Sequence, residues 1–180
     1  NVSACLRSAE AFGISHIEVV CLENKFKAST VARGVSKWLT IRTHNSIDSC
    51  VKSLREDGFK LAAALPRPDS SSVGELTLEK PLALVFGNEH RGLDKPWYDH
   101  INTFFTISMY GMVESLNISV AAAICMQMLS AKLRDSSNLP CDKKLIGIKT
   151  QKRLLNEWAC EHFPQWKKLY DETKKKYIKN

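Results

Sequence analysis

The feature that most constrains the fold is the continuous apolar run Leu82–Phe86, which stands between Pro81 and Gly87. A short apolar strand with turn residues at both ends is typical of a parallel sheet that is buried on both faces. Apolar runs that predict further strands lie at residues 17–22, 39–42, 59–65 and 102–107. Segments with helical spacing alternate with these runs. The pattern predicts an α/β domain, with a mainly parallel sheet and helices on both of its faces.

The predicted helices between these strands have recognisable ends. Residues 3–12 carry apolar side chains at helical spacing and stop at Gly13. Residues 47–56 follow Ser46, a residue type that caps helices, and residues 30–38 predict a further short helix. Residues 66–74, rich in Pro, Ser and Asp, predict a surface loop.

The length and charge of the chain bound its organisation. With 180 residues, 44% of them hydrophobic, it can form one compact domain and a terminal extension. We place the domain at residues 1–134, a linker at 135–149, and a basic helical extension at 150–180. The net charge of +7 favours a polyanionic partner such as nucleic acid, although it also suits a basic protein without one.

The cysteines and histidines do not form a metal-binding pattern. Six cysteines are scattered without a C-x-x-C pair, which is best explained by buried thiols in a reduced, intracellular protein. The five histidines are also dispersed, so we expect no structural metal. No apolar run approaches membrane-spanning length, and no signal pattern opens the chain. We therefore expect a cytoplasmic protein without membrane contact.

The segment 107–124 changes character at its middle. Its first half, around Gly111, suits neither a long helix nor a strand, whereas its second half is a helix of small residues that runs toward Arg134. Ser115 and Asn117 are residue types that cap helices, so the N–H groups of the first turn would face whatever the loop encloses. These groups suit a ligand with acceptor atoms, but the same residues fit an ordinary capped helix packed on a sheet.

Three stretches then carry a family resemblance. They read Asn-x-x-Ala-x-x-Arg at residues 1–7, Phe-Gly-Asn-Glu-x-x-Gly-Leu at 86–93, and Ser-Leu-Asn-x-Ser-x-Ala at 115–121. Together they resemble the motifs of the TrmH-like, SpoU branch of the SPOUT RNA methyltransferases. The resemblance extends to about Arg134, and more weakly to residues 153–164, which look like the C-terminal extension of tRNA-modifying members. Family members have a strand before the first motif, so we expect that strand to precede Asn1.

This resemblance implies a fold, a cofactor and a reaction. The expected fold has a deep trefoil knot in the C-terminal part of the domain, and the expected cofactor is S-adenosylmethionine. The reaction is methyl transfer to a ribose 2′-hydroxyl of RNA, foremost the guanosine at position 18 of tRNA. Ribosomal RNA is an alternative substrate, and a knotted RNA-binding protein without activity is an alternative from another class. The family pocket is completed in a twofold homodimer, for which Met126 and Met128 are interface candidates.

The resemblance also implies roles for individual residues. Arg7 would assist the reacting hydroxyl, either as a base or as a clamp on phosphate and ribose, because a guanidinium is expected to stay protonated. Asn1 would orient Arg7, and Glu89 would fix Arg7 or the substrate. The remaining predicted catalytic residues are Ser115 and Asn117, the cofactor site is Ala63, Ala64, Gly87, Ile107, Met109 and Leu116, and the RNA contacts are Arg91, Lys174, Lys175 and Lys176. Gly87 would let the backbone approach the cofactor closely.

Overall fold

The computed structural model describes residues 1–21, 38–88, 91–135 and 148–177. The chain divides into two compact units, Asn1–Asp135 and Ser136–Asn180. The predicted helix at residues 30–38 lies, except for Trp38, outside the described residues. Within the described ranges, no helix combines the length and the apolar character that crossing a membrane requires.

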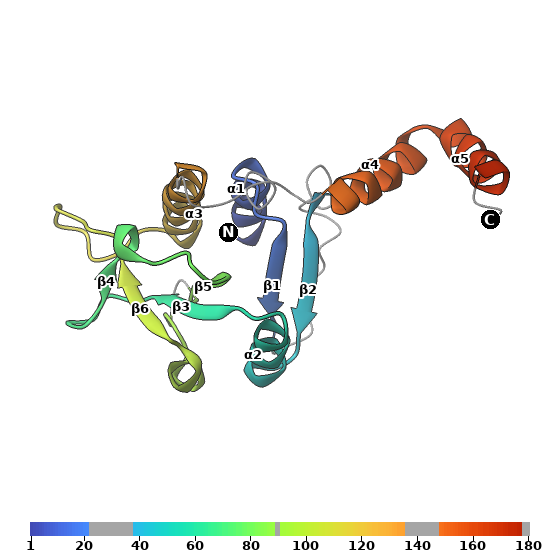
Figure 1. The fold of residues 1–180 in the computed structure, drawn as a ribbon. Helices are drawn as coiled ribbons and strands as arrows, with labels where there is room; N and C mark the ends of the chain where they lie inside the picture. The colour runs from blue at the N-terminus through green and yellow to red at the C-terminus, as the bar shows by residue number, and fades with distance from the viewer. Residues whose placement is uncertain (22–37, 89–90, 136–147, 178–180) are drawn as a thin grey trace. The chain divides into compact units, whose positions relative to one another are not determined.

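Four parallel strands form the larger sheet of the first unit, in the order β4-β6-β3-β5 (Figure 1). They are β3 (Lys60–Ala64), β4 (Ser71–Ser72), β5 (Leu82–Val85) and β6 (Thr103–Thr106). The strands predicted at residues 59–65, 82–86 and 102–107 are confirmed, with slightly shorter ends. The apolar runs therefore located the three strands that are most buried in this sheet.

The segment 66–74 is more than the predicted surface loop. Ser71 and Ser72 pair with β6 as β4, and the 3-10 helix η2 (Val73–Glu75) follows at once. The Ser72 N–H donates to the Glu75 carboxylate at 2.7 Å, which fixes the start of η2. The prediction of a plain loop is wrong here, because two serines carry no apolar alternation and their pairing depends on backbone groups alone.

Different helices cover the two faces of this sheet. Successive side chains of β3 point to opposite sides. Leu61 and Ala63 pack in one cluster with residues of α2 (Ile47–Glu56), whereas Ala62 packs with Cys125 and Leu129 of α3 (Ile118–Asp135). The prediction of helices on both faces is confirmed. The predicted cap is also confirmed, since the Ser46 hydroxyl accepts a hydrogen bond from the Ser49 N–H at 3.2 Å.

A second, two-stranded parallel sheet consists of β1 (His16–Val20) and β2 (Thr40–His44). The predicted single sheet is thus divided in two over the described residues. Helix α1 (Val2–Ala11) packs against α3, where Ala9, Ala122 and Met126 share one buried cluster. The interface role predicted for Met126 is therefore wrong, because small residues let α1 approach and cover it. Met128 remains 39% exposed.

The second unit contains two helices, α4 (Ile148–His162) and α5 (Pro164–Tyr177). At their junction the rings of Trp158 and Phe163 meet edge to face, with centroids 5.7 Å apart. The Trp166 indole N–H donates to the Asn156 side-chain oxygen at 3.1 Å. These contacts join the two helices around Pro164, a residue that suits the first turn of a helix.

Candidate active site

Three loops leave the larger sheet at the same edge. Strands β5 and β6 both pair in parallel with the central strand β3, so the segments that follow these strands, residues 65–70, 86–92 and 107–117, begin at their shared carboxyl end. After β3 the chain forms β4 on one side of the sheet, crosses to β5 on the other side of β3, and then enters β6 between β3 and β4. A point where the strand order reverses in this way is where open α/β sheets bind their ligands.

The alanines predicted at this edge have different surroundings. Ala63 is wholly buried on the α2 side of the sheet and pairs with Val85 and Phe104. It therefore offers no side chain to a ligand, and its predicted cofactor contact stays a prediction that concerns its backbone alone. Ala64 pairs with Phe105 and is half-buried, so the end of β3 near the loops is formed by Ala64.

The loop after β5 is closed by its own backbone. The N–H groups of Asn88 and Gly92 each donate to the carbonyl of the other, at 2.7 and 2.8 Å. A Cβ on Gly87 would overlap the Gly92 carbonyl group and the Leu93 nitrogen. Gly87 is thus required first by the loop itself, which is a different reason from the cofactor contact predicted. Glu89 lies outside the described residues, and Arg91 is exposed.

The loop after β6 has peptide groups that the fold does not use. The backbone of residues 108–116 makes no hydrogen bond with any other described residue. Ile107 at its start packs against the core cluster of the sheet, and Leu116 near its end is half-buried. Met109 is 37% exposed, and Ser115 is exposed. This loop combines half-buried apolar side chains with available N–H and C=O groups, a suitable lining for a heterocyclic ligand.

Asn117 begins helix α3. Its side-chain oxygen accepts from the Ser119 N–H at 2.9 Å and from the Ser119 hydroxyl at 2.6 Å. Its carbonyl accepts from the N–H groups of Val120 and Ala121. The cap predicted for this position is confirmed for Asn117, whose side-chain oxygen bonds to the first turn of the helix.

The first-motif residues lie on α1. The Asn1 carbonyl accepts from the Cys5 N–H at 3.0 Å, but the Asn1 side chain does not cap the helix. Leu6 and Ala9 are buried, whereas Arg7 is exposed and has no ion pair or hydrogen bond to another described residue. Among the described residues of the loops, none is in polar contact with Arg7. Lys174, Lys175 and Lys176 lie in α5, and their side chains lie outside those described.

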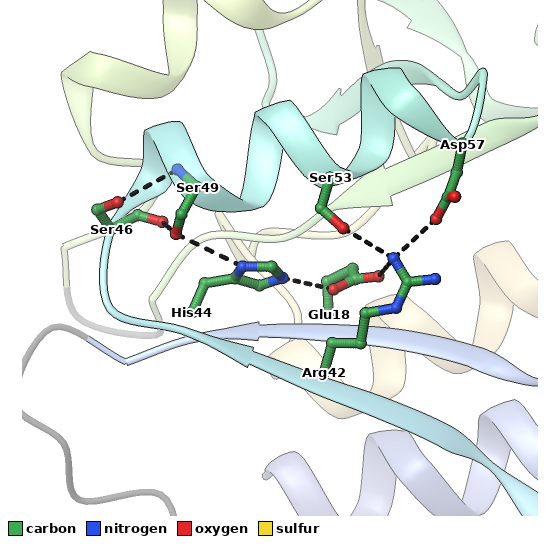
Figure 2. Close-up of polar contacts among 7 residues, drawn as sticks. All are labelled: Glu18, Arg42, His44, Ser46, Ser49, Ser53 and Asp57. Atoms are coloured by element: carbon green, nitrogen blue, oxygen red, sulfur yellow. Dashed lines mark hydrogen bonds and ion pairs between the residues drawn. The ribbon is translucent and has the colours of Figure 1, made fainter.

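Sequence reasoning missed a polar cluster between β1, β2 and α2. Figure 2 shows the Glu18 carboxylate between His44 on one side and Arg42 on the other. The His44 Nε2 lies 2.6 Å from a carboxylate oxygen of Glu18, within hydrogen-bond distance. The Arg42 guanidinium donates hydrogen bonds to the Ser53 hydroxyl and the Asp57 carboxylate, both at 2.7 Å. The contacts with Asp57 and Glu18 raise the pKa of Arg42. The paired strands bring these residues together, and no short motif marks them.

A surface hollow of about 450 Å³ lies elsewhere on α2. Its lining carries charges of both signs and no residue of the three motifs: Asp48, Val51, Lys52, Arg55, Glu56 and His100. The His100 ring lies 3.5 Å from the Asp48 carboxylate. Nothing in this lining favours one class of ligand over another.

Parallel strands with helices on both faces define an α/β domain, with the three loops at the carboxyl ends of its strands. The profile of the SpoU rRNA Methylase family matches residues 1–127. The chain belongs to this family. The tRNA (guanosine(18)-2′-O)-methyltransferase of Thermus thermophilus is 33% identical over 145 residues, covering 77% of this chain and 75% of that protein.

Two further relatives show how much of the chain is shared. The tRNA (guanosine(18)-2′-O)-methyltransferase of Borreliella burgdorferi is 33% identical over 138 residues, covering 76% of this chain. The chain spans 63% of the length of that relative. The crystal structure of the A. aeolicus TrmH/SpoU tRNA modifying enzyme is similar with a TM-score of 0.71 at 26% identity, covering 90% of this chain and 82% of that one.

Proposed function

We propose that this protein transfers a methyl group from S-adenosylmethionine to a ribose 2′-hydroxyl of tRNA, at the guanosine of position 18. The observation that carries the proposal is the third-motif loop, residues 107–117, with its unused peptide groups at the carboxyl edge of the sheet. The relatives from Thermus and Borreliella, whose names state this reaction, support it.

The residues of this edge fit the cofactor. N–H and C=O groups from residues 108–116 can read the donor and acceptor edge of adenine, while Ile107 and Leu116 provide apolar walls. Ala64, Gly87 and Met109 complete the proposed cofactor site, and Ala63 contributes only the backbone of the strand behind it. S-adenosylmethionine would supply a methyl carbon already activated by a sulfonium, so the chain has mainly to position the acceptor hydroxyl.

The proposed catalytic group is Arg7. Its guanidinium is exposed and stays protonated, so it suits a role in holding the phosphate and ribose or polarising the 2′-oxygen better than literal removal of a proton. Asn1 and Glu89 are proposed to orient Arg7. Ser115 and Asn117 are proposed to bind the substrate beside the cofactor loop.

The proposal extends to assembly and RNA binding. A homodimer would bring a second copy to the exposed apolar side chains of the third-motif loop, where Tyr110 and Met112 are 98% and 100% exposed. The proposed RNA contacts are Arg91 in the domain and Lys174–Lys176 in the basic helical extension. The proposed division is a domain at residues 1–134, a linker at 135–149 and this extension at 150–180. A deep trefoil knot in the C-terminal part of the domain and a cytoplasmic location complete the proposal.

The test uses the full chain and S-adenosylmethionine labelled in its methyl group. One tRNA transcript carries guanosine at position 18, and a matched transcript carries adenosine there. We expect label only in the first, in a dinucleotide that survives alkali because its 2′-hydroxyl is blocked. Label in a ribosomal RNA fragment instead would establish the alternative substrate that the family name suggests. Cofactor binding by calorimetry without transfer to any RNA would establish a non-catalytic binding protein.

A further inference from the structure

Three metal-ligating side chains from three different elements meet in the first unit. A carboxylate oxygen of Glu18, a ring nitrogen of His44 and the sulfur of Cys50 all lie within 4.8 Å of one another. Cys50 is 2% exposed, and the Glu18 and His44 side chains are 12% and 11% exposed. The sequence predicted no metal site, because Glu18 is distant in the chain from His44 and Cys50 and the three residues belong to no motif.

The local fold explains why they meet. In the parallel pair, Glu18 lies opposite Arg42, and Val20 lies opposite His44. Glu18 and His44 therefore project from the same face of the sheet as diagonal neighbours. The chain then turns at Ser46 into α2, whose first turn carries Cys50 back over that face.

The surrounding contacts hold two of the three groups in place. The Ser49 hydroxyl donates to the Ser46 carbonyl at 2.9 Å and lies 3.5 Å from the His44 Nδ1 (Figure 2). Arg42 lies 3.6 Å from the Glu18 carboxylate oxygen that does not bond to His44. Such outer contacts orient the ligands of a metal site. The other carboxylate oxygen of Glu18 and the Nε2 of His44 face each other at 2.6 Å, and an ion bound by both would replace the hydrogen bond between them.

The donor set selects a class of ion. One oxygen, one nitrogen and one sulfur match Zn²⁺, whereas Ca²⁺ and Mg²⁺ require oxygen ligands. Ligand atoms around a tetrahedral zinc lie about 3.3 to 3.8 Å apart, given bond lengths of about 2.0 to 2.3 Å. Side-chain rotations that move the three ligand atoms by about 1 Å would bring them to such distances. The partial exposure of Glu18 and His44 leaves room for water as a fourth ligand.

We propose that Glu18, His44 and Cys50 bind a zinc-class divalent ion, which ties β1 and β2 to the first turn of α2. The site is separate from the motif loops and does not depend on the proposed methyl transfer. Binding releases the thiol proton of Cys50, because zinc takes the sulfur as thiolate. The Arg42 guanidinium, neutralised by Asp57 at 2.7 Å, remains the outer partner of Glu18.

Cobalt(II) titration of the full-length, reduced and metal-stripped protein tests the proposal, because cobalt bound to a thiolate gives a charge-transfer absorption band. We expect saturation at one ion per chain and loss of the band on addition of Zn²⁺. Cys50→Ser should abolish the band. Cys125→Ser is the matched control, since Cys125 is equally buried but lies in the apolar cluster of α3. That variant should keep the band.

Two further variants keep the test decisive if Cys50→Ser fails to fold. Glu18→Gln retains the size of the side chain and a hydrogen bond to His44, and it should weaken cobalt affinity by at least about tenfold, the smallest loss typical of a metal-site partner. His44→Ala should do the same, whereas His100→Ala, beside the carboxylate of Asp48, should not. The proposal would be overturned if the wild type showed no saturable cobalt binding, or if Glu18→Gln and His44→Ala bound cobalt as tightly as the wild type. The cluster would then be an ordinary ion pair beside a buried thiol.

Discussion

Gly87 and Gly92 lie so close together that a side-chain carbon on Gly87 would occupy the place of the Gly92 carbonyl. The reciprocal hydrogen bonds of Asn88 and Gly92 hold the backbone in this arrangement. The conformation of the second-motif loop therefore depends on contacts within the loop. Gly87 is required for these contacts, whether or not a ligand is bound.

Gly87→Ala should consequently lower the free energy of unfolding by about 1 to 3 kcal/mol, the usual cost of overpacking, and weaken S-adenosylmethionine binding along with it. Gly74→Ala is the control, because its new methyl group would meet the Met128 side chain at 3.8 Å and the Ser72 hydroxyl at 4.0 Å, both ordinary contact distances. Urea unfolding and calorimetry measure both effects. A wild-type unfolding midpoint for Gly87→Ala would show that the loop rearranges without cost.

Arg7 is exposed on α1, so its removal should barely change stability, by no more than about 0.5 kcal/mol. Arg7→Ala should nevertheless lose methyl transfer by at least about a hundredfold, while cofactor affinity is retained. Arg7→Lys should recover part of the rate if a point charge on phosphate suffices, and none if a planar bidentate contact is needed. Arg55→Ala on α2 is a control of equal charge. Single-turnover rates at saturating tRNA decide between these outcomes, and a near-normal rate for Arg7→Ala would leave Glu89 as the next candidate.

Asn117 has both a structural and a proposed catalytic role, and two variants separate them. Asn117→Ala removes the cap of α3 and should cost about 1 kcal/mol. Asn117→Asp keeps an oxygen for the Ser119 N–H and should retain most of that stability. If the amide nitrogen binds substrate, Asn117→Asp should still lose transfer. A stable and fully active Asn117→Asp would restrict Asn117 to capping.

Burial raises the pKa of the Cys125 thiol from 9.0 to about 11. Because the folded state holds this proton more tightly than the unfolded state, the stabilisation is complete below about pH 9 and is lost as the pH rises to about 11. Unfolding by urea under reducing conditions should show a decline over this window, of up to about 3 kcal/mol for a shift of two pKa units. Cys125→Ala should reduce the decline, whatever its effect on stability at neutral pH. An identical pH profile in the variant would show that other groups cause it.

The lysines of α5 are expected to contact phosphate. Replacing Lys174, Lys175 and Lys176 with Gln should weaken tRNA binding and flatten its salt dependence, since fewer counterions are released. The slope of log affinity against log salt is negative, and its magnitude should decrease by up to about 3 if all three lysines contact duplex phosphates. Replacing the exposed Lys52, Lys60 and Lys80 with Gln makes the same charge change elsewhere. Equal effects of the two triple variants would indicate general attraction without a specific contact.

Local signals predicted the parts of the fold that depend on neighbouring residues. The apolar run ending at Phe86 located β5, and Ser46 located the start of α2, because strand burial and helix capping are decided within a few residues. The third-motif segment was placed as a loop followed by a helix for the same reason. Its cofactor, by contrast, came only from resemblance, since peptide groups look alike in every sequence.

Local sequence signals did not predict the features that depend on contacts between residues far apart in the chain. Ser71 and Ser72 became a strand only because β6 lies beside them, and Met126 became buried only because α1 packs on α3. The meeting of Glu18, His44 and Cys50 depends on a strand register and a helix turn together. The six-residue separation of His44 and Cys50, across a capping serine that follows a strand, is the one local trace that a sequence search can use.

The packing of α1 on α3 also sets an order for folding. Arg134 donates to the carbonyl of Phe12 across 122 residues of chain, at 3.1 Å. Helix α1 precedes both sheets in the sequence, whereas α3, which covers Ala9, follows them. Contacts of such long sequence separation slow folding and leave apolar surface uncovered in the nascent chain. During synthesis the helix that carries Arg7 therefore cannot reach its native packing until nearly all of residues 1–135 have left the exit tunnel.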